Sequence, residues 1–326
     1  MNLKNPRPGK NLNDKIAVVY SSAYEINLAG LEKLHAFDIK KYSKIYRQLL
    51  DDKLLTPEQV HVPAEITREE ILTVQTEAFL KSLKSSSTIA RYTEANVLAI
   101  LPAATLEAGV LRKFRRASGG TLLAARQALD CGIAINIGGG YHHAKPEIGE
   151  GFCVYADVPI AIRVLQEEKK ISRALVIDLD VHQGNGTAVC LADDPETFTF
   201  SIHQGDIYPL PKEESDLDVE VDAGTGDKEY IALLSKHLDP VIEKAKPDIV
   251  FYVAGCDTLE GDPLANLQMT PAGIVKRDTM VIEACAKRNI PVVMTLSGGY
   301  SKNAWGAQYL SIAHLIREHS GEQKEP

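Results

Sequence analysis

Short runs of apolar and β-branched residues alternate along this chain with longer segments in which apolar residues recur at helical spacing. The short runs predict buried strands at residues 16–20, 133–137, 174–180, 197–203, 248–254 and 291–297. The longer segments predict helices, for example at residues 67–82, 121–129, 157–168, 227–244 and 270–288. This alternation is typical of βαβ units and predicts an α/β protein with a mainly parallel sheet, covered by helices on both faces.

One helix carries a clear start signal in its sequence. Thr270 stands where an N-cap residue is expected, and Pro271 follows at the first helical position. No linker rich in proline, glycine or serine divides the chain, and no internal repeat is present. We therefore expect a single domain over residues 1–326.

The charge of the chain argues against some partners. Its 36 basic and 44 acidic residues give a net charge of 36 − 44 = −8. Such a balance disfavours a nonspecific grip on nucleic acid or on an anionic membrane surface. We expect no direct nucleic-acid partner, and the sequence does not indicate an oligomeric state.

The number and spacing of the cysteines and the length of the apolar segments indicate the cellular compartment of the protein. The five cysteines are an odd number, are widely spaced and contain no Cys-x-x-Cys pair, which argues against a disulfide framework and against a thiolate zinc site. Residues 1–15 are polar, and no uninterrupted apolar stretch approaches the ~18 residues of a membrane span. We expect a soluble protein of the reducing cytoplasm.

Several predicted strands end in glycines and in side chains that can do chemistry. In an open parallel sheet, ligands bind beyond the carboxyl ends of the strands. The segments that follow the strands are Gly138-Gly139-Gly140-Tyr141-His142-His143, His182-Gln183-Gly184-Asn185-Gly186, Gly255-Cys256-Asp257 and Ser297-Gly298-Gly299-Tyr300. Their glycines let the backbone approach a ligand closely, so we expect the functional site at this edge of the sheet.

Two carboxylates and one imidazole make a candidate metal site. Alternate side chains of an extended chain share a face, so Asp178, Asp180 and His182 should lie together. A metal held by Asp180, His182 and Asp257 would keep an open position, as catalytic metal sites do. These ligands suit Zn²⁺, and Fe²⁺ or Mn²⁺ also fits them. For Asp257 alone, a turn-forming aspartate is an equally good explanation.

The adjacent imidazoles of His142 and His143 are candidates for proton transfer. One would accept the proton of an attacking water and the other would assist a leaving amine, with Asp178 placed to orient an imidazole. Tyr300 would donate to the oxyanion of an attacked carbonyl. Histidines at the surface and a tyrosine packed at a turn are the alternatives for each motif alone. Together the residues predict a metal-assisted amide hydrolase.

The same segments resemble the signature blocks of the zinc-dependent histone deacetylases. The blocks are residues 138–143, 178–186, 255–263 and 297–300, and the resemblance extends from about residue 16 to residue 311. Class IV deacetylases are the most similar class, on the blocks at residues 183–186, 151–157, 271–278 and 30–35. The resemblance implies a three-layer α/β/α fold related to arginase.

The resemblance also implies roles for individual residues. It implies zinc on Asp180, His182 and Asp257, a catalytic pair of His142 and His143 in which Asp178 backs His142, and stabilisation of the tetrahedral intermediate by Tyr300. The implied tunnel for the methylenes of an acyl-lysine is lined by Gly140, Phe152, Tyr208 and Leu264. The implied structural potassium ion would contact the side chains of Asp178, Asp180 and Ser201 and the backbone carbonyls of His182 and Ile202.

Two positions depart from related families. Asn185 stands where better-known deacetylases place an aspartate behind the second histidine, and its amide brings no negative charge. We therefore expect His143 to be more readily neutral near pH 7, which favours it as the general base. Gly184 stands where binuclear arginase-like hydrolases have a further carboxylate, so a single metal is expected.

The leading functional hypothesis is the removal of an acetyl or longer fatty acyl group from lysine side chains of proteins by metal-activated water. Acetylated polyamines or other small amides are alternative substrates. A binding module that holds acyl-lysine without turnover is a less favoured alternative. A dehydrogenase is disfavoured because residues 138–143 do not follow the Gly-x-Gly-x-x-Gly pattern of a dinucleotide site.

Overall fold

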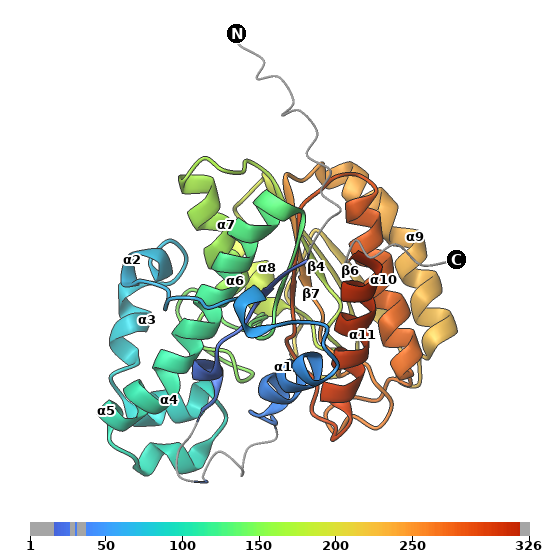
Figure 1. Cartoon of the computed structure of the whole chain (residues 1–326). Helices are drawn as coiled ribbons and strands as arrows, with labels where there is room; N and C mark the ends of the chain where they lie inside the picture. Colours follow the sequence, from blue (N-terminus) through green and yellow to red (C-terminus); the bar gives the residue numbers. More distant parts are fainter. Residues whose placement is uncertain (1–15, 27–29, 31–36, 320–326) are drawn as a thin grey trace.

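A parallel sheet runs through the centre of the protein, as the computed structural model shows (Figure 1). The model describes residues 16–26, 30 and 37–319. In that part of the chain the sheet has eight strands in the order β2-β1-β3-β8-β7-β4-β5-β6, and every strand pair is parallel. The strands are β1 (Ala17–Val19), β2 (Val60–His61), β3 (Ile133–Asn136), β4 (Ala174–Asp178), β5 (Thr197–Gln204), β6 (Leu217–Val221), β7 (Ile249–Val253) and β8 (Val292–Thr295).

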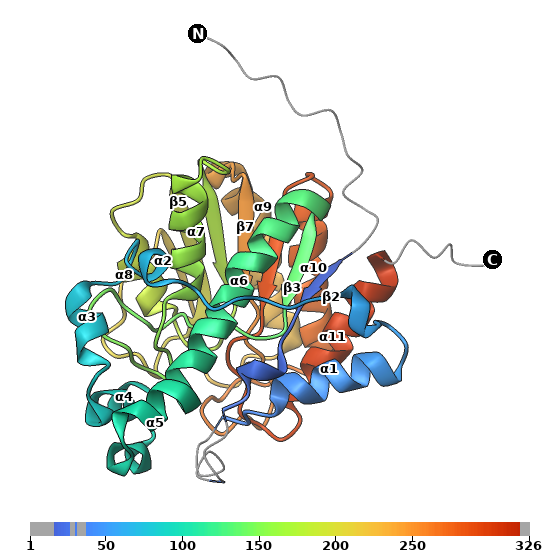
Figure 2. The same ribbon diagram turned by 60° about the vertical axis from the view of Figure 1, so that its left-hand side comes forward.

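Helices cover both faces of this sheet. The helices are α1 (Lys41–Asp51), α2 (Arg68–Ile71), α3 (Glu77–Ser82), α4 (Ser86–Tyr92), α5 (Ala103–Leu106), α6 (Arg112–Cys131), α7 (Asp157–Glu167), α8 (Asn185–Leu191), α9 (Asp227–Ala245), α10 (Pro271–Ala286) and α11 (Ala304–His319). Helices α1, α9, α10 and α11 lie on one face and α2 to α8 on the other (Figures 1 and 2).

Each face of the sheet has its own apolar core. Along β3, Ile133 and Ile135 pack toward the α9 to α11 side, whereas Ala134 packs toward α6 and α7. Along β4, Leu175 and Val176 divide between the two cores in the same way. This period of two is what a strand buried on both faces requires. The predicted three-layer α/β/α architecture with a mainly parallel sheet is confirmed.

The predicted strand over residues 174–180 ends too late. Strand β4 ends at Asp178, because the side chains of Asp178 and Asp180 each close a turn in the residues that follow. The Asp178 carboxylate accepts a hydrogen bond from the amide of Asp180 (3.1 Å), and the Asp180 carboxylate accepts one from the amide of His182 (3.0 Å). Aspartate favours such local bonds two residues ahead, and they turn the chain out of the extended conformation.

The predicted helix over residues 67–82 is wrong, because the structure contains two short helices there. Thr67 caps α2 and Thr76 caps α3, each through a hydrogen bond from the backbone amide three residues ahead (both 3.1 Å). Between them, the Gln75 side chain donates to the carbonyl of Val154 (3.0 Å). A tertiary contact thus interrupts the helix and ties it to the segment around Phe152.

Several other expectations can be compared directly with the structure. Thr270 caps α10 through a bond from the amide of Gly273 (3.1 Å), and Pro271 is the first residue of this helix, as predicted. All five cysteines are free thiols. No helix among the described residues is long and apolar enough to cross a membrane. The sequence block at residues 30–35 falls outside the described residues except for its first position.

Candidate active site

The loop after β3 is anchored by one buried carboxylate. Asp157, at the start of α7, accepts hydrogen bonds from the backbone amides of Gly140 and Tyr141 (both 2.8 Å) and from the hydroxyl of Thr121 (2.6 Å). Gly139 and Gly140 both have positive φ (69° and 80°), which favours glycine. The loop therefore leaves β3 in a fixed direction, with His142 and His143 directly after it.

Asp180, His182 and Asp257 come together at the ends of the neighbouring strands β4 and β7. One potential ligand atom from each lies within 4.8 Å of the others, and all three residues are buried. Nδ1 of His182 lies 3.2 Å from Oδ1 of Asp180 and 3.3 Å from Oδ2 of Asp257. The three residues are therefore close enough to share one ion.

The environment of this group fits a cation. Oδ2 of Asp257 is buried and has no hydrogen-bond partner among the described residues. Burial, together with the charge on Asp180, raises the pKa of Asp257 to about 7, so its ionised form needs positive charge nearby. A β-carbon on Gly255 would lie 2.2 Å from Oδ2 of Asp180, so a side chain there would collide with a candidate ligand.

The two imidazoles have different partners behind them. Nδ1 of His142 lies 2.8 Å from Oδ2 of Asp178, whereas Nδ1 of His143 lies 2.6 Å from Oδ1 of Asn185. The ring centroids of the two histidines are 4.0 Å apart. The structure thus places an aspartate behind one imidazole and an amide behind the other.

The surroundings of the two histidines shift their pKa values in opposite directions. Burial lowers the pKa of His142, but the charges on Asp178 and Asp180 outweigh this effect and raise the pKa to about 9. Burial and the positive charges on His142 and His182 lower the pKa of His143 well below its ordinary value. Near neutral pH the pair therefore holds one charged and one neutral imidazole, an arrangement suited to acid and base roles.

Tyr300 lies at the same edge of the sheet, on the loop after β8. Its ring centroid is 6.3 Å from that of His182 and 5.7 Å from that of Phe152. Burial, with the charges on Asp257 and Asp180, raises the pKa of Tyr300 well above its ordinary value, so the phenol keeps its proton.

Two side chains from distant segments hold the Tyr300 loop. The buried ammonium of Lys41 donates to the carbonyls of Ser297 (2.7 Å) and Gly298 (2.8 Å). The Asp262 carboxylate accepts from the amides of Tyr300 (2.7 Å) and Leu264 (3.0 Å). The Lys41 ammonium thus holds the loop through two of its carbonyls, and the Asp262 carboxylate holds it through the Tyr300 amide and links it to Leu264.

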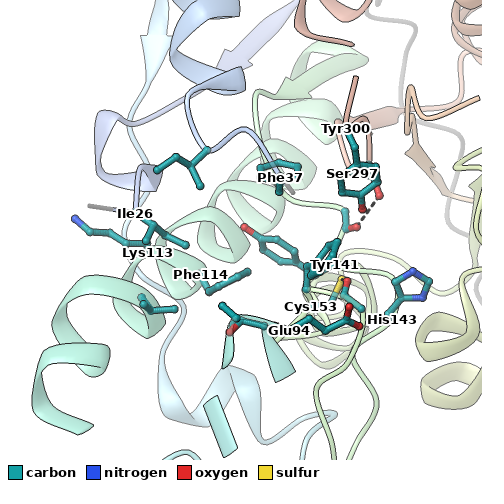
Figure 3. Close-up of a pocket in the computed structure, with 18 of the residues that line it drawn as sticks. Ile26, Phe37, Glu94, Lys113, Phe114, Tyr141, His143, Cys153, Ser297 and Tyr300 are labelled. Atoms are coloured by element: carbon teal, nitrogen blue, oxygen red, sulfur yellow. Dashed lines mark hydrogen bonds between the residues drawn. The ribbon is translucent and has the colours of Figure 1, made fainter. Parts of the chain in front are cut away.

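A cavity of about 520 Å³ opens beside these residues (Figure 3). His142, His143 and Tyr300 are among the residues that line it. Its other walls are largely apolar and include Ile26, Phe37, Val97, Leu98, Val110, Phe114 and Tyr141. A cavity of this size and character is typical of sites for small ligands or for an apolar substituent.

The predicted tunnel residues divide into two groups. Gly140, Phe152 and Leu264 line the cavity. Tyr208 is not among its lining residues, but its ring centroid lies 5.0 Å from that of His143. The segment that carries Tyr208 is held by Gln183, whose side chain donates to the carbonyl of Glu213 (2.6 Å).

Of the predicted potassium ligands, Asp178, Ser201 and Ile202 lie on the adjacent strands β4 and β5, and Asp180 and His182 lie in the loop after β4. Asp178 is paired in register with Ser201, and Ile202 is the next residue of β5. The Ser201 hydroxyl lies 2.8 Å from Nδ1 of His203, and the Ile202 carbonyl accepts a hydrogen bond from the Tyr230 hydroxyl (3.5 Å). These groups already have protein partners, and a potassium ion here stays a prediction.

The sequence reasoning did not predict the residues that support the site. Lys41, Asp157 and Asp262 contact the loops that carry the candidate catalytic residues from distant parts of the chain, and Glu150 accepts from the Asn185 side chain (2.6 Å). The buried guanidinium of Arg277 donates to the carbonyl of Gly255 (2.7 Å), just before Asp257. Asp157, Asp262 and Arg277 had a signal, because they stand in the blocks at residues 151–157, 255–263 and 271–278 that resemble the deacetylases, whereas Lys41 and Glu150 stand in none of the blocks.

Comparison with known proteins identifies the family. The family model described as the histone deacetylase domain matches residues 35–316. The chain belongs to the histone deacetylase family. Histone deacetylase 2 of Arabidopsis thaliana is 40% identical over 307 residues, which cover 93% of this chain and 79% of that protein.

Other relatives of this deacetylase-family chain carry different names. An uncharacterized protein of Picosynechococcus sp. is 37% identical over 93% of this chain and 95% of its own length. The acetoin utilization protein AcuC of Staphylococcus aureus is 29% identical over 91% of this chain and 82% of its own length. The family indicates an amide hydrolase, and these names do not resolve its substrate.

The fold is that of a solved deacetylase domain. The crystal structure of the HDA15 HD domain superimposes with a TM-score of 0.74 over 92% of this chain and 90% of that chain, at 22% sequence identity. The expected arginase/deacetylase-like fold is confirmed, and at this level of identity the likeness concerns the fold alone. Histone deacetylases are typically metal-dependent, and the buried group of Asp180, His182 and Asp257 could hold a metal.

Proposed function

We propose that this protein is a zinc-dependent deacylase of the class IV type, which removes acetyl or longer acyl groups from lysine side chains of proteins. One observation carries the proposal. His142 and His143, backed by a carboxylate and an amide respectively, lie beside the buried group of Asp180, His182 and Asp257 and line an apolar cavity. An amide hydrolase needs this combination, whereas a protein that only binds acyl-lysine does not.

Each residue of the site has a role in the proposed reaction. A bound Zn²⁺ would polarise the amide carbonyl and lower the pKa of the attacking water. Nε2 of His143 accepts the proton of that water, since Nδ1 faces Asn185. The Tyr300 hydroxyl donates to the carbonyl oxygen as it becomes negative.

The remaining step releases the amine. The bond between the carbonyl carbon and the nitrogen breaks, and the nitrogen takes a proton from the histidine pair, in which His142 is the charged member. The products are a free amine and a carboxylic acid. One proton enters the pair from the water and one leaves it to the nitrogen, so the total charge of the pair is unchanged over the reaction.

The size of the cavity supports acyl groups longer than acetyl. Its volume of about 520 Å³ exceeds what an acetyl group fills, and its apolar walls include Phe114 of α6 and Val97 and Leu98 of the short turn Asn96–Ile100. Burial of each additional methylene contributes about 0.8 kcal/mol of binding free energy. The lysine stem would lie between Phe152 and Leu264.

The test compares substrates on the zinc-loaded protein. Release of free amine is followed for acetyl-lysine and dodecanoyl-lysine peptides and for an acetylated polyamine, before and after metal chelation, with Tyr300→Phe as the control that keeps only a low residual activity. We expect turnover of both peptides, loss on chelation and recovery with zinc. Preference for the polyamine would support a small-molecule deacetylase instead. Binding of acyl-lysine without turnover would support a non-catalytic module.

A further inference from the structure

Behind the second histidine, a chain of polar groups extends beyond Asn185. Oδ1 of Asn185 lies 2.6 Å from Nδ1 of His143, and Nδ2 of Asn185 donates to Oε1 of Glu150 (2.6 Å). The same oxygen of Glu150 lies 3.2 Å from the ammonium of Lys145, which also contacts Glu213 (3.0 Å). Residue 185 is therefore an amide and not a carboxylate, and a carboxylate, that of Glu150, lies at the end of the Asn185 amide that points away from the imidazole.

The two ends of the Asn185 amide are chemically different but nearly equal in shape. If the oxygen faces His143, Nδ1 of the imidazole must carry the proton and Nε2 is free to accept one. If the amide is turned over, its NH₂ group donates to Nδ1 and the proton moves to Nε2. The second arrangement cannot act as a base at the cavity, so the orientation of the amide decides whether His143 is competent.

Glu150 distinguishes between the two orientations because a carboxylate only accepts hydrogen bonds. It pairs with the NH₂ group of Asn185 and would face an oxygen if the amide turned over. Asn185 is 1% exposed, so water cannot compensate for that lost bond. The Lys145 ammonium contacts the same carboxylate oxygen and helps to hold it in place.

The local backbone brings Glu150 to this position. Gly151 has a φ of 54°, and a β-carbon there would lie 2.4 Å from the His143 ring. The amide of Cys153 donates to the carbonyl of Glu150 (2.9 Å), which closes a tight turn. The turn places Glu150 behind Asn185 and Phe152 on the wall of the cavity.

We propose that Glu150 is a positioning residue, which fixes the Asn185 amide so that His143 carries its proton on Nδ1 and presents Nε2 as the base. This inference rests on the proposed function for its effect on rate. The tautomer of His143, however, is a property of the folded protein and needs no turnover.

The first experiment measures steady-state kinetics of zinc-loaded variants. For Glu150→Ala we expect kcat to fall by about tenfold or more, since general base catalysis contributes about 10²-fold or more. KM should change little, because Glu150 is not among the residues that line the cavity. Glu150→Gln keeps an acceptor oxygen and should recover most of the loss. Glu147→Ala, an exposed glutamate of the same loop, is the matched control and should match wild type.

The second experiment reverses donor and acceptor. Asn185→Asp alone puts two carboxylates face to face, whereas Asn185→Asp combined with Glu150→Gln restores a donor opposite an acceptor. We expect the double variant to exceed the single variant in kcat by about tenfold, a gain that loss of packing alone would not produce. A double variant no better than Asn185→Asp would overturn the proposal.

The third experiment observes the tautomer directly. Imidazole ¹⁵N shifts of labelled zinc-loaded protein, with His143→Ala for assignment, should show Nδ1 protonated in wild type and a mixture of tautomers in Glu150→Ala. An unchanged tautomer would overturn the role of Glu150 even if kcat fell. Absence of deacylase activity in wild type would refute the proposed function instead, and the ¹⁵N result would still decide this inference.

Discussion

A β-carbon on Gly298 would lie 2.0 Å from Oδ2 of Asp257, one of the candidate metal ligands. It would also lie 2.6 Å from Oδ2 of Asp180. Gly298→Ala must therefore displace both carboxylates. We expect affinity for Zn²⁺ to fall by about tenfold or more, as changes next to metal ligands commonly cause, measured by competition with a chromogenic chelator.

The matched control for this substitution is Gly306→Ala in α11. A β-carbon at Gly306 would meet no atom within 4 Å, so its zinc affinity should stay at the wild-type value. An equal loss of affinity in both variants would contradict the steric explanation.

Removal of the metal should lower the stability of the fold. A ligand that binds only the native state stabilises it by about 2.7 kcal/mol when present at a hundred times its Kd. Thermal unfolding of the zinc-loaded protein should thus occur at higher temperature than that of the chelated protein. Asp257→Asn, which removes a charged candidate ligand, should show no such difference. The idea fails if zinc leaves the wild-type Tm unchanged.

The pH dependence of the rate should report on Asn185. A carboxylate in Asn185→Asp adds negative charge beside His143 and raises the pKa that burial now holds low. Because protonated His143 cannot accept a proton, the acidic limb of the pH-rate profile should move to higher pH, by about 1 unit. Asn266→Asp, at an exposed asparagine, is the control and should leave the limb in place. An unmoved limb in Asn185→Asp would contradict the assignment of His143 as the base.

Asp262 should act on the rate through Tyr300. Asp262→Asn replaces one acceptor oxygen with a donor, so the bond to the amide of Tyr300 or that to the amide of Leu264 is lost. We expect kcat to fall several-fold in the wild-type background. In the Tyr300→Phe background the same change should lower kcat little further, because the effects of substitutions at residues that act together are not additive. Equal losses in both backgrounds would show that Asp262 acts elsewhere.

The space in the cavity that the proposed acyl chain would fill can be reduced by a larger side chain at Val97. Val97 lines the cavity and is partly exposed, so Val97→Trp should fill part of the space without disrupting the core. Hydrolysis of dodecanoyl-lysine should fall by about tenfold, whereas that of acetyl-lysine should stay near the wild-type value. Val62→Trp, at a valine that is 68% exposed, is the control. An equal loss of both activities would argue against binding of the acyl chain beside Val97.

The sequence predicted the central strands well because they are buried on both faces. Residues 133–137 and 248–254 are apolar except for Asn136 and Asp248, and β3 and β7 lie within them. Strand β2 has only two residues, and β6 at the edge of the sheet is mostly half-exposed and alternates with acidic side chains. Neither gives a continuous apolar run, so both escaped prediction.

The candidate ligands and histidines could be proposed because each lies at the end of a predicted strand or in the short segment after it. Their supports could not, since a polar residue on a helix or loop gives no sign of its partner. Lys41 lies 256 residues from Ser297 along the chain, and Glu150 is 35 residues from Asn185. From the sequence alone, Lys41 would be taken for one of many solvent-exposed lysines, yet this residue is 1% exposed. Such contacts follow only from the tertiary fold.

The pairing of β4 with β7 has a consequence for how this protein can diversify. Neighbouring strands lie about 4.8 Å apart, so the backbone ladder itself sets the separation of the side chains that follow each strand. Phe152, Tyr208 and Leu264, in contrast, belong to connecting segments outside the sheet. Loops of this kind tolerate replacement far better than the strands between them. Related proteins could therefore differ in the loops that contact the substrate and still keep the same arrangement of the side chains that follow β4 and β7.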